Sequence, residues 1–466
     1  MGHAVARSSA MSSREAIATG LALAFLAGPW NRAALCERAE QVLGERPRWL
    51  ASLVRHLLQR LPEAPNNACA SLCEEIQRAP SFRQSLVPGR PTAKLVKLLV
   101  GEPSMGQCRW PVPTLCTTVD VASWLGLAPA QLDWFADVRG LNGEVGTCAL
   151  HHYSFQWLPK RHGGYRLVEA PKSRLKAIQR QMVREILDLV PVHDAAHGFV
   201  AGRSALTCAR VHAGREVLLR LDLEEFFPSI GAPRIYRTFR GFGYPEPVAR
   251  VLTGLSTLKV SAAVLDTMPP RAFGEHLDTS ALAARARARK RLRHRHLAQG
   301  APTSPALANL ASFRLDARLA GAARALGVRY SRYADDLAFS GDGDFARRAQ
   351  RFEALVAAIA SDEGFRINHH KTRLMLQSQS QHWLGLVVND QPAVSRAERD
   401  RLEAILTNAA RHGLKSQNRE GDPHFLESLR GRVAWVEHVN AAHARKLQQL
   451  LAVCSERPSA PPRPRS

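Results

Sequence analysis

Adjacent carboxylates at Asp335 and Asp336 are the residues of this sequence that most clearly suggest chemistry. They lie in the stretch SRYADDLAFSG, residues 331–341, where apolar positions alternate on both sides of a tight link at Ala334–Asp335. This alternation predicts two short strands of a β-hairpin with the acids at its tip. Because like charges so close raise each other's pKa and cost stability, the doublet predicts a bound cation.

A third carboxylate, Asp222, ends the apolar run EVLLRLDL, residues 216–223, which predicts a buried central strand. An acid at the end of such a strand is costly unless it is paired or binds a metal. Three carboxylates can hold two Mg²⁺ ions about 4 Å apart, the arrangement that supports in-line phosphoryl displacement. Taken alone, however, the doublet fits an ordinary acidic turn and Asp222 a strand-end cap, so the surrounding sequence must decide.

The segments predicted to position Asp222, Asp335 and Asp336 are preceded on the chain by a region that predicts helices. Residues 48–61 carry apolar side chains at the helical period, and residues 118–137 predict two short helices broken at Pro129. This pair is expected to be scaffold, with a small DNA-reading helix pair as the alternative. The apolar stretch 17–28 predicts a buried helix, with a signal peptide as the alternative, because it falls short of the about 20 residues that span a bilayer.

Further along the chain, the pattern changes to strands and loops. Residues 153–171 predict a hairpin that turns at Gly163–Gly164. A helix is expected over about 173–189, and another is expected to begin with Ser304 as its N-cap and Pro305 at its first position.

The composition favours a polyanionic partner. Lys and Arg total 64 against 41 Asp and Glu, a formal net charge of +23. Nucleic acid is the first expectation and an anionic membrane surface the second, while an enzyme from an arginine-rich proteome is the alternative. The eight cysteines are scattered without CxxC spacing, which favours a reducing cytoplasm over a disulfide framework or a zinc site. We therefore expect a cytoplasmic protein without a membrane segment.

Two segments together resemble a known family. Tyr-Ala-Asp-Asp lies between predicted strands, and LDLEEFFPSI precedes it by about 110 residues. This pair resembles both metal-binding segments of reverse transcriptases, and the similarity, in order over roughly residues 118–450, is specifically to bacterial retron reverse transcriptases. The resemblance implies an α+β right-hand polymerase with fingers, a palm with a small antiparallel sheet, a helical thumb and an N-terminal helical extension. It implies that Asp222, Asp335 and Asp336 bind two Mg²⁺ ions, with Mn²⁺ as the alternative.

The resemblance also implies residues that contact the deoxynucleoside triphosphate. Lys160 and Arg166 in the fingers would bind the triphosphate, for which ammonium and guanidinium groups are suited, with a solvated hairpin charge as the alternative for either. Phe227 would lie under the sugar and exclude a 2′-hydroxyl. The remaining expected contacts are Arg203 in AAHGFVAGRS, along the template or the triphosphate, and Gln299 and Gly300 in QGAPTSP near the nascent base pair. Lys371 would be the proton donor to pyrophosphate, with an ordinary surface lysine as the alternative.

Other positions suggest RNA binding. In CARVH, Ala209 and His212 match the retron pattern Asn-Ala-x-x-His, while Cys208 replaces its asparagine. A second departure is Trp383-Leu384-Gly385, where retrons have Val-Thr-Gly, within the hairpin expected at 382–390 to grip the primer. A basic run, residues 285–296, ends a long insertion and is expected to attract phosphates, with a disordered solvated loop as the alternative. Its candidate residues are Arg287, Arg289, Lys290 and Arg291.

The resulting division is an N-terminal extension (1–105), a segment with the fingers (106–215), a palm (216–390) with the basic insertion at about 231–298, a thumb (391–455) and a disordered basic tail (456–466). The function implied is DNA synthesis on a dedicated structured non-coding RNA, primed from an RNA 2′-hydroxyl to give branched RNA–DNA, in antiphage defence. The partners would be that RNA, its RNA–DNA product and deoxynucleoside triphosphates, with a nearby-encoded effector left open. Another bacterial reverse transcriptase and a non-catalytic RNA-binding scaffold are the alternatives.

Overall fold

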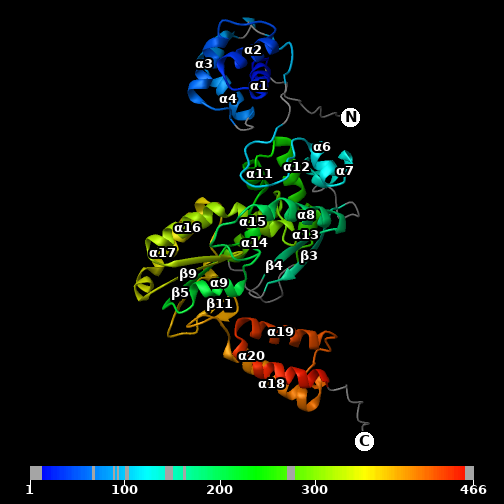
Figure 1. The fold of residues 1–466 in the computed structure, drawn as a ribbon, viewed down its shortest axis with the longest axis vertical. Helices are drawn as coiled ribbons and strands as arrows, with labels where there is room; N and C mark the ends of the chain where they lie inside the picture. Colours follow the sequence, from blue (N-terminus) through cyan, green and yellow to red (C-terminus); the bar gives the residue numbers. More distant parts are fainter. Residues whose placement is uncertain are drawn as a thin grey trace. The chain divides into compact units, whose positions relative to one another are not determined.

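The computed structural model describes residues 13–65, 69–87, 90–91, 94–99, 104–141, 151–160, 164–269 and 279–456. The chain forms two compact units, of which the first holds residues 1–138 with 236–253 and the second holds residues 139–235 with 254–466. Helices and small antiparallel sheets make up both units (Figure 1). The five-part division drawn from the sequence stays a prediction.

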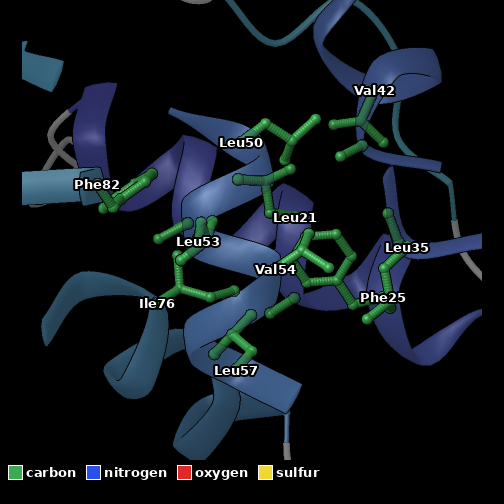
Figure 2. Packing of buried hydrophobic residues seen from close by; sticks show 14 of the residues in the cluster. Leu21, Phe25, Leu35, Val42, Leu50, Leu53, Val54, Leu57, Ile76 and Phe82 are labelled. Atoms are coloured by element: carbon green, nitrogen blue, oxygen red, sulfur yellow. The ribbon is translucent and has the colours of Figure 1, made fainter. Parts of the chain in front are cut away.

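A helical core opens the first unit. Leu21 and Phe25 from one helix meet Leu53 and Leu57 from another in a fully buried cluster (Figure 2). The buried helix predicted for 17–28 and the helical period predicted for 48–61 are therefore confirmed. The elements are α1 (Ser13–Leu26), α2 (Arg32–Leu43), α3 (Leu50–Arg60), α4 (Cys69–Arg78), α5 (Pro80–Ser85), β1 (Leu86–Val87) and β2 (Arg90–Pro91).

Two short helices follow in the same unit, as predicted from the break at Pro129. Helix α6 (Thr118–Trp124) begins with a capping box between Thr117 and Asp120, and α7 (Pro129–Ala136) has Pro129 at its first position, where a missing N–H costs nothing. Parts of α11 (Ala232–Gly241) and α12 (Glu246–Ser256) belong to this unit as well.

A four-stranded antiparallel sheet is the centre of the second unit. Its strand order is β10-β5-β9-β8, so β5, which contains the predicted apolar run, is flanked on both sides. Helix α17 packs through Phe352 on the face that carries Phe339, and α9 packs through His212 on the opposite face, which carries Ser340. The elements are α9 (Ala205–His212), β5 (Val217–Asp222), α16 (Phe313–Ala325), β8 (Arg329–Tyr333), β9 (Asp336–Gly341), α17 (Gly343–Asp362) and β10 (Arg373–Leu376).

The predicted hairpin at 153–171 forms from two antiparallel strands, although Gly163 at its turn lies outside the described residues. The helix expected to start after a Ser304 cap instead begins at Thr303 and is interrupted at Ser312. The elements around these segments are β3 (Tyr153–Pro159), β4 (Tyr165–Pro171), α8 (Ser173–Glu185), η2 (Leu187–Leu189), α10 (Phe226–Ser229), β6 (Thr257–Leu258), α13 (Ala262–Asp266), α14 (Thr279–Leu292), β7 (His296–Leu297) and α15 (Thr303–Ala311).

The C-terminal part of this unit joins a small sheet to three helices through one apolar core. The hairpin predicted at 382–390 is confirmed, and Trp383 in its first strand is fully buried. The elements are η3 (His369–Lys371), β11 (His382–Trp383), β12 (Leu386–Val387), β13 (Ala393–Val394), α18 (Arg396–His412), η4 (Leu414–Ser416), α19 (Phe425–Val439) and α20 (Ala441–Glu456). The tail from 457 lies outside the described residues, and within those described no helix is both long and apolar enough to cross a bilayer.

Candidate active site

The sheet register brings the three predicted acids together. Strand β5 pairs with β9 so that Asp222 lies directly opposite Asp336, a geometry that places Cβ atoms about 4.5–5.5 Å apart. Asp335 lies in the two-residue link between β8 and β9, after Ala334 at a φ of +55°. The backbone N–H of Leu223 donates to the Asp335 carbonyl at 2.8 Å, which fixes this link beside the end of β5.

Two cations of the chain itself contact these acids. The Arg220 guanidinium donates from Nη2 to Asp336 Oδ1 at 2.8 Å, and Lys371 Nζ lies 2.9 Å from Asp222 Oδ2. Asn368 Nδ2 also donates to Asp222 Oδ1 at 3.2 Å. Among the described residues, no group of three or more His, Cys, Asp and Glu side chains forms a ready cage for a metal ion. Arg220 and Lys371 each contact one oxygen of their carboxylate, so a metal ion can bind the other oxygen without displacing either cation.

The electrostatics of the acids nevertheless suit a divalent cation. Burial, and then the negative charges of Asp336 and Asp222, raise the pKa of Asp335 to about 6. Burial also raises the pKa of Asp336, although Arg220 opposes this shift. Clustered carboxylates in a partly dry site are the oxygen donors that hard divalent ions prefer, so the donor set fits such an ion.

A buried ion pair supports the link that carries Asp335. Arg332 is fully buried and donates to both carboxylate oxygens of Asp316, at 2.7 and 2.6 Å. Its Nη1 also donates to Asn309 Oδ1 at 2.9 Å and to the Ala334 carbonyl at 3.1 Å. Arg332 was missed in the sequence, where its position directly before the Tyr-Ala-Asp-Asp motif was the available signal.

Strand β4 holds the loop that carries the predicted Gln299 and Gly300. The Gln299 N–H donates to Glu169 Oε2 at 2.9 Å, and the Glu169 N–H donates to the Gln299 carbonyl at 2.9 Å. Gly300 has a φ of +132°, and a Cβ there would lie 3.1 Å from the Glu169 carbonyl. The other Glu169 oxygen pairs with buried His296 at 2.9 Å. Glu169, which belongs to none of the motifs recognised in the sequence, therefore sets the position of this loop.

The predicted contacts to the triphosphate and its sugar lie at the β3–β4 hairpin and in α10. Phe226 is buried, while its neighbour Phe227 is only partly buried. Lys160 Nζ pairs with Glu225 Oε1 at 2.6 Å. Arg166 is exposed on β4.

The expectation that Ala209 and His212 contact RNA directly is wrong, because both side chains are buried in α9. His212 lies between the hydroxyls of Ser331 and Ser340, each 2.7 Å from a ring nitrogen. Burial lowers the pKa of His212 to about 3, so the ring is neutral. Trp383, which begins the segment that differs from the retron Val-Thr-Gly, also belongs to the buried core, since its ring lies 5.9 Å from that of His212.

Several predicted cations have partners within the chain. Arg203 Nη1 donates to the carbonyls of His193, Asp194 and Ala196 at 3.0, 2.9 and 2.7 Å, so this group positions backbone. The segment 285–296 is helical through Leu292 rather than a disordered loop. In this segment Arg287 Nη2 donates to Glu224 Oε1, Arg289 Nη2 to Asp266 Oδ1 and Arg291 Nη1 to the Glu224 carbonyl, whereas the Lys290 side chain is exposed.

Comparisons with known proteins agree on one class. A family described as reverse transcriptase (RNA-dependent DNA polymerase) matches residues 158–388, a segment that contains all three acids. The Retron Mx65 reverse transcriptase of Myxococcus xanthus is 39% identical over 341 residues, which cover 73% of this chain and 72% of the relative. The Retron Mx162 reverse transcriptase of the same organism is 38% identical, over 73% of this chain and 68% of the relative. The Retron Ec86 reverse transcriptase of Escherichia coli is 30% identical, over 48% and 59%.

Proposed function

The chain belongs to the retron reverse transcriptase family and is an RNA-directed DNA polymerase, and we propose that Asp222, Asp335 and Asp336 hold two Mg²⁺ ions at its active site. The observation that carries this proposal is the register that sets Asp222 opposite Asp336, with Asp335 in the adjoining link. When bound, the ions would activate the primer hydroxyl and stabilise the leaving oxygen of the phosphoryl transfer.

The chain's own groups would then position the reactants and move a proton. Lys371, which contacts Asp222 in this structure, would turn from that carboxylate to the departing pyrophosphate and donate its proton. Arg166 and Lys160 would bind the triphosphate, Lys160 after leaving Glu225. Because catalysis of phosphoryl transfer is mostly positioning and electrostatic stabilisation, these contacts would account for much of the rate.

Selection of the incoming nucleotide would depend on Phe227 and the loop of Gln299. A partly buried aromatic side chain after the first acid would leave no room for a 2′-hydroxyl and so would select deoxynucleotides. Glu169 holds the Gln299 loop through two hydrogen bonds of 2.9 Å, which supports a fixed surface beside the nascent base pair.

The template would be a dedicated structured non-coding RNA, as the retron names of the relatives suggest. Synthesis would start from a 2′-hydroxyl within that RNA and give a branched RNA–DNA product, in a system of antiphage defence with an effector protein encoded nearby. The net charge of +23 supports a polyanionic partner of this kind.

Sequencing the nucleic acid that copurifies with the chain from its host tests this function. We expect one short structured RNA joined to DNA, with a branch that survives digestion of the linear RNA. The Asp335→Asn variant is the matched control and should retain the RNA but carry no DNA. Linear DNA copied from many unrelated RNAs would contradict the proposal.

A further inference from the structure

Phe199 is an aromatic side chain in an unusual position. It is 55% exposed, and its φ of +61° lies in the left-handed region. A bulky residue in this region is a conformational outlier, and such outliers persist only where the surrounding structure holds them. Burial of the ring is therefore not what keeps Phe199 in place.

The backbone immediately before Phe199 is held against the β8–β9 link that carries Asp335. The His197 N–H donates to the Arg332 carbonyl at 2.8 Å, and Asn309 Nδ2 donates to the Gly198 carbonyl at 2.8 Å. Gly198 approaches so closely that a Cβ there would lie 2.7 Å from the Ala334 backbone nitrogen. These contacts place Phe199 next to the link that carries Asp335.

The ring of Phe199 has two aromatic neighbours that flank the acids in sequence. Its centroid lies 6.3 Å from that of Phe227 and 6.3 Å from that of Tyr333, with ring planes tilted by 48° and 40°. Phe227 follows Asp222 on the chain, and Tyr333 directly precedes the link between β8 and β9 that carries Asp335. The exposed ring therefore forms a group of three aromatic side chains with Phe227 and Tyr333, beside the link that carries Asp335.

We propose that Phe199 contacts a nucleobase at the growing end of the RNA–DNA duplex and so helps to position the primer terminus. This inference rests on the polymerase function and names a further contact residue for the same site. Aromatic rings stack on any base, because every base has a π-face. The loss of one such stacking contact weakens the affinity for nucleic acid strongly. An exposed ring held in a strained backbone beside the acids is suited to that contact.

Duplex binding by the full chain, measured with a fluorescent DNA primer annealed to an RNA template in EDTA, tests the proposal. The key variant is Phe199→Gly, because glycine adopts a φ of +61° without strain while removing the ring. Stacking on one base predicts a Kd about 5- to 150-fold weaker for this variant. Phe199→Tyr, which keeps the π-face, should bind as wild type does, and Phe199→Leu should fall between them.

Thermal unfolding separates binding from folding. Phe199→Gly should unfold at no lower temperature than wild type, since the ring is exposed and the backbone strain is relieved. Wild-type affinity in Phe199→Gly, or affinity in Phe199→Tyr as weak as in Phe199→Gly, would overturn the proposal. Because the assay contains no metal ion and measures no synthesis, failure of the proposed metal site would leave its result unaffected.

Discussion

At the residue scale, the site combines clustered acids with cations from the same chain. Lys371 and Arg220 lie within 2.9 and 2.8 Å of carboxylate oxygens of Asp222 and Asp336. Asp335 has no such cation at its carboxylate among the described residues, and its pKa is raised to about 6. We infer that the internal cations balance part of the repulsion and that divalent ions would complete the balance at Asp335.

His212 gives a pH prediction at the same scale. Its pKa is about 3 in the folded chain, mainly through burial, but about 6.5 in an unfolded chain. Below pH 6.5 the unfolded state therefore binds a proton that the folded state does not, and stability falls as the pH decreases toward 3. This one group should contribute a loss of about 1.4 kcal/mol in the free energy of unfolding per pH unit.

Urea unfolding of wild type and His212→Gln between about pH 7 and pH 5 checks the prediction. The variant should be less stable overall, because it disturbs two buried serine hydroxyls, but its stability should decrease less steeply with acid. His412→Gln, which replaces an exposed histidine, should retain the wild-type slope. Equal slopes for His212→Gln and wild type would show that the ring is protonated in the folded chain.

The sequence could predict some of these residues and not others. The acids were found because their motif and spacing are distinctive. Arg332 and Phe199 were missed because a buried ion pair and a left-handed φ depend on tertiary contacts that no local pattern records. The same limit explains the error at His212, whose motif suggested RNA binding although its side chain is fully buried.

At the element scale, strand pairing determines the site. The alternating and continuous apolar runs predicted β5, β8 and β9, and the register between β5 and β9 then sets which acid lies opposite which. Boundaries were less predictable. The start of α15 at Thr303 and its interruption at Ser312 follow from packing rather than from the Ser304–Pro305 capping signal.

Helix α14 and its C-terminal end give a prediction about electrostatics. Lys290 and Arg293 are exposed, whereas Arg289 is engaged by Asp266 and the Leu265 carbonyl. If the exposed cations bind RNA phosphates, the double variant Lys290→Ala/Arg293→Ala should weaken RNA binding. The slope of log Kd against log salt should become shallower by about 1 for each cation–phosphate interaction that the substitutions remove.

Titrating a structured RNA at several salt concentrations measures these slopes. Arg289→Ala is the matched control and should change the slope less, because its guanidinium is already paired within the chain. A double variant with the wild-type slope would exclude this helix end from the RNA interface.

At the scale of the whole molecule, the sequence predicted the class of protein and part of its helical core, but it did not predict how distant segments group into the two units. The net charge of +23 indicated a polyanionic partner, and apolar patterns predicted two of the helices that build the core of residues 17–82, at 17–28 and at 48–61. The grouping of residues 236–253 with the first unit was not predicted, because contacts between segments distant in sequence leave no local pattern.

Deoxynucleotide incorporation on an RNA template with a DNA primer, measured with and without Mg²⁺, tests whether the three acids form the active site. If the three acids hold catalytic ions, Asp335→Asn should lower the Mg²⁺-dependent rate by about a thousandfold, as loss of several kcal/mol of charge stabilisation implies. Its affinity for the duplex should stay close to that of wild type, and the exposed control Asp342→Asn should remain active. Near-normal DNA synthesis by Asp335→Asn would show that the three acids do not hold the catalytic ions.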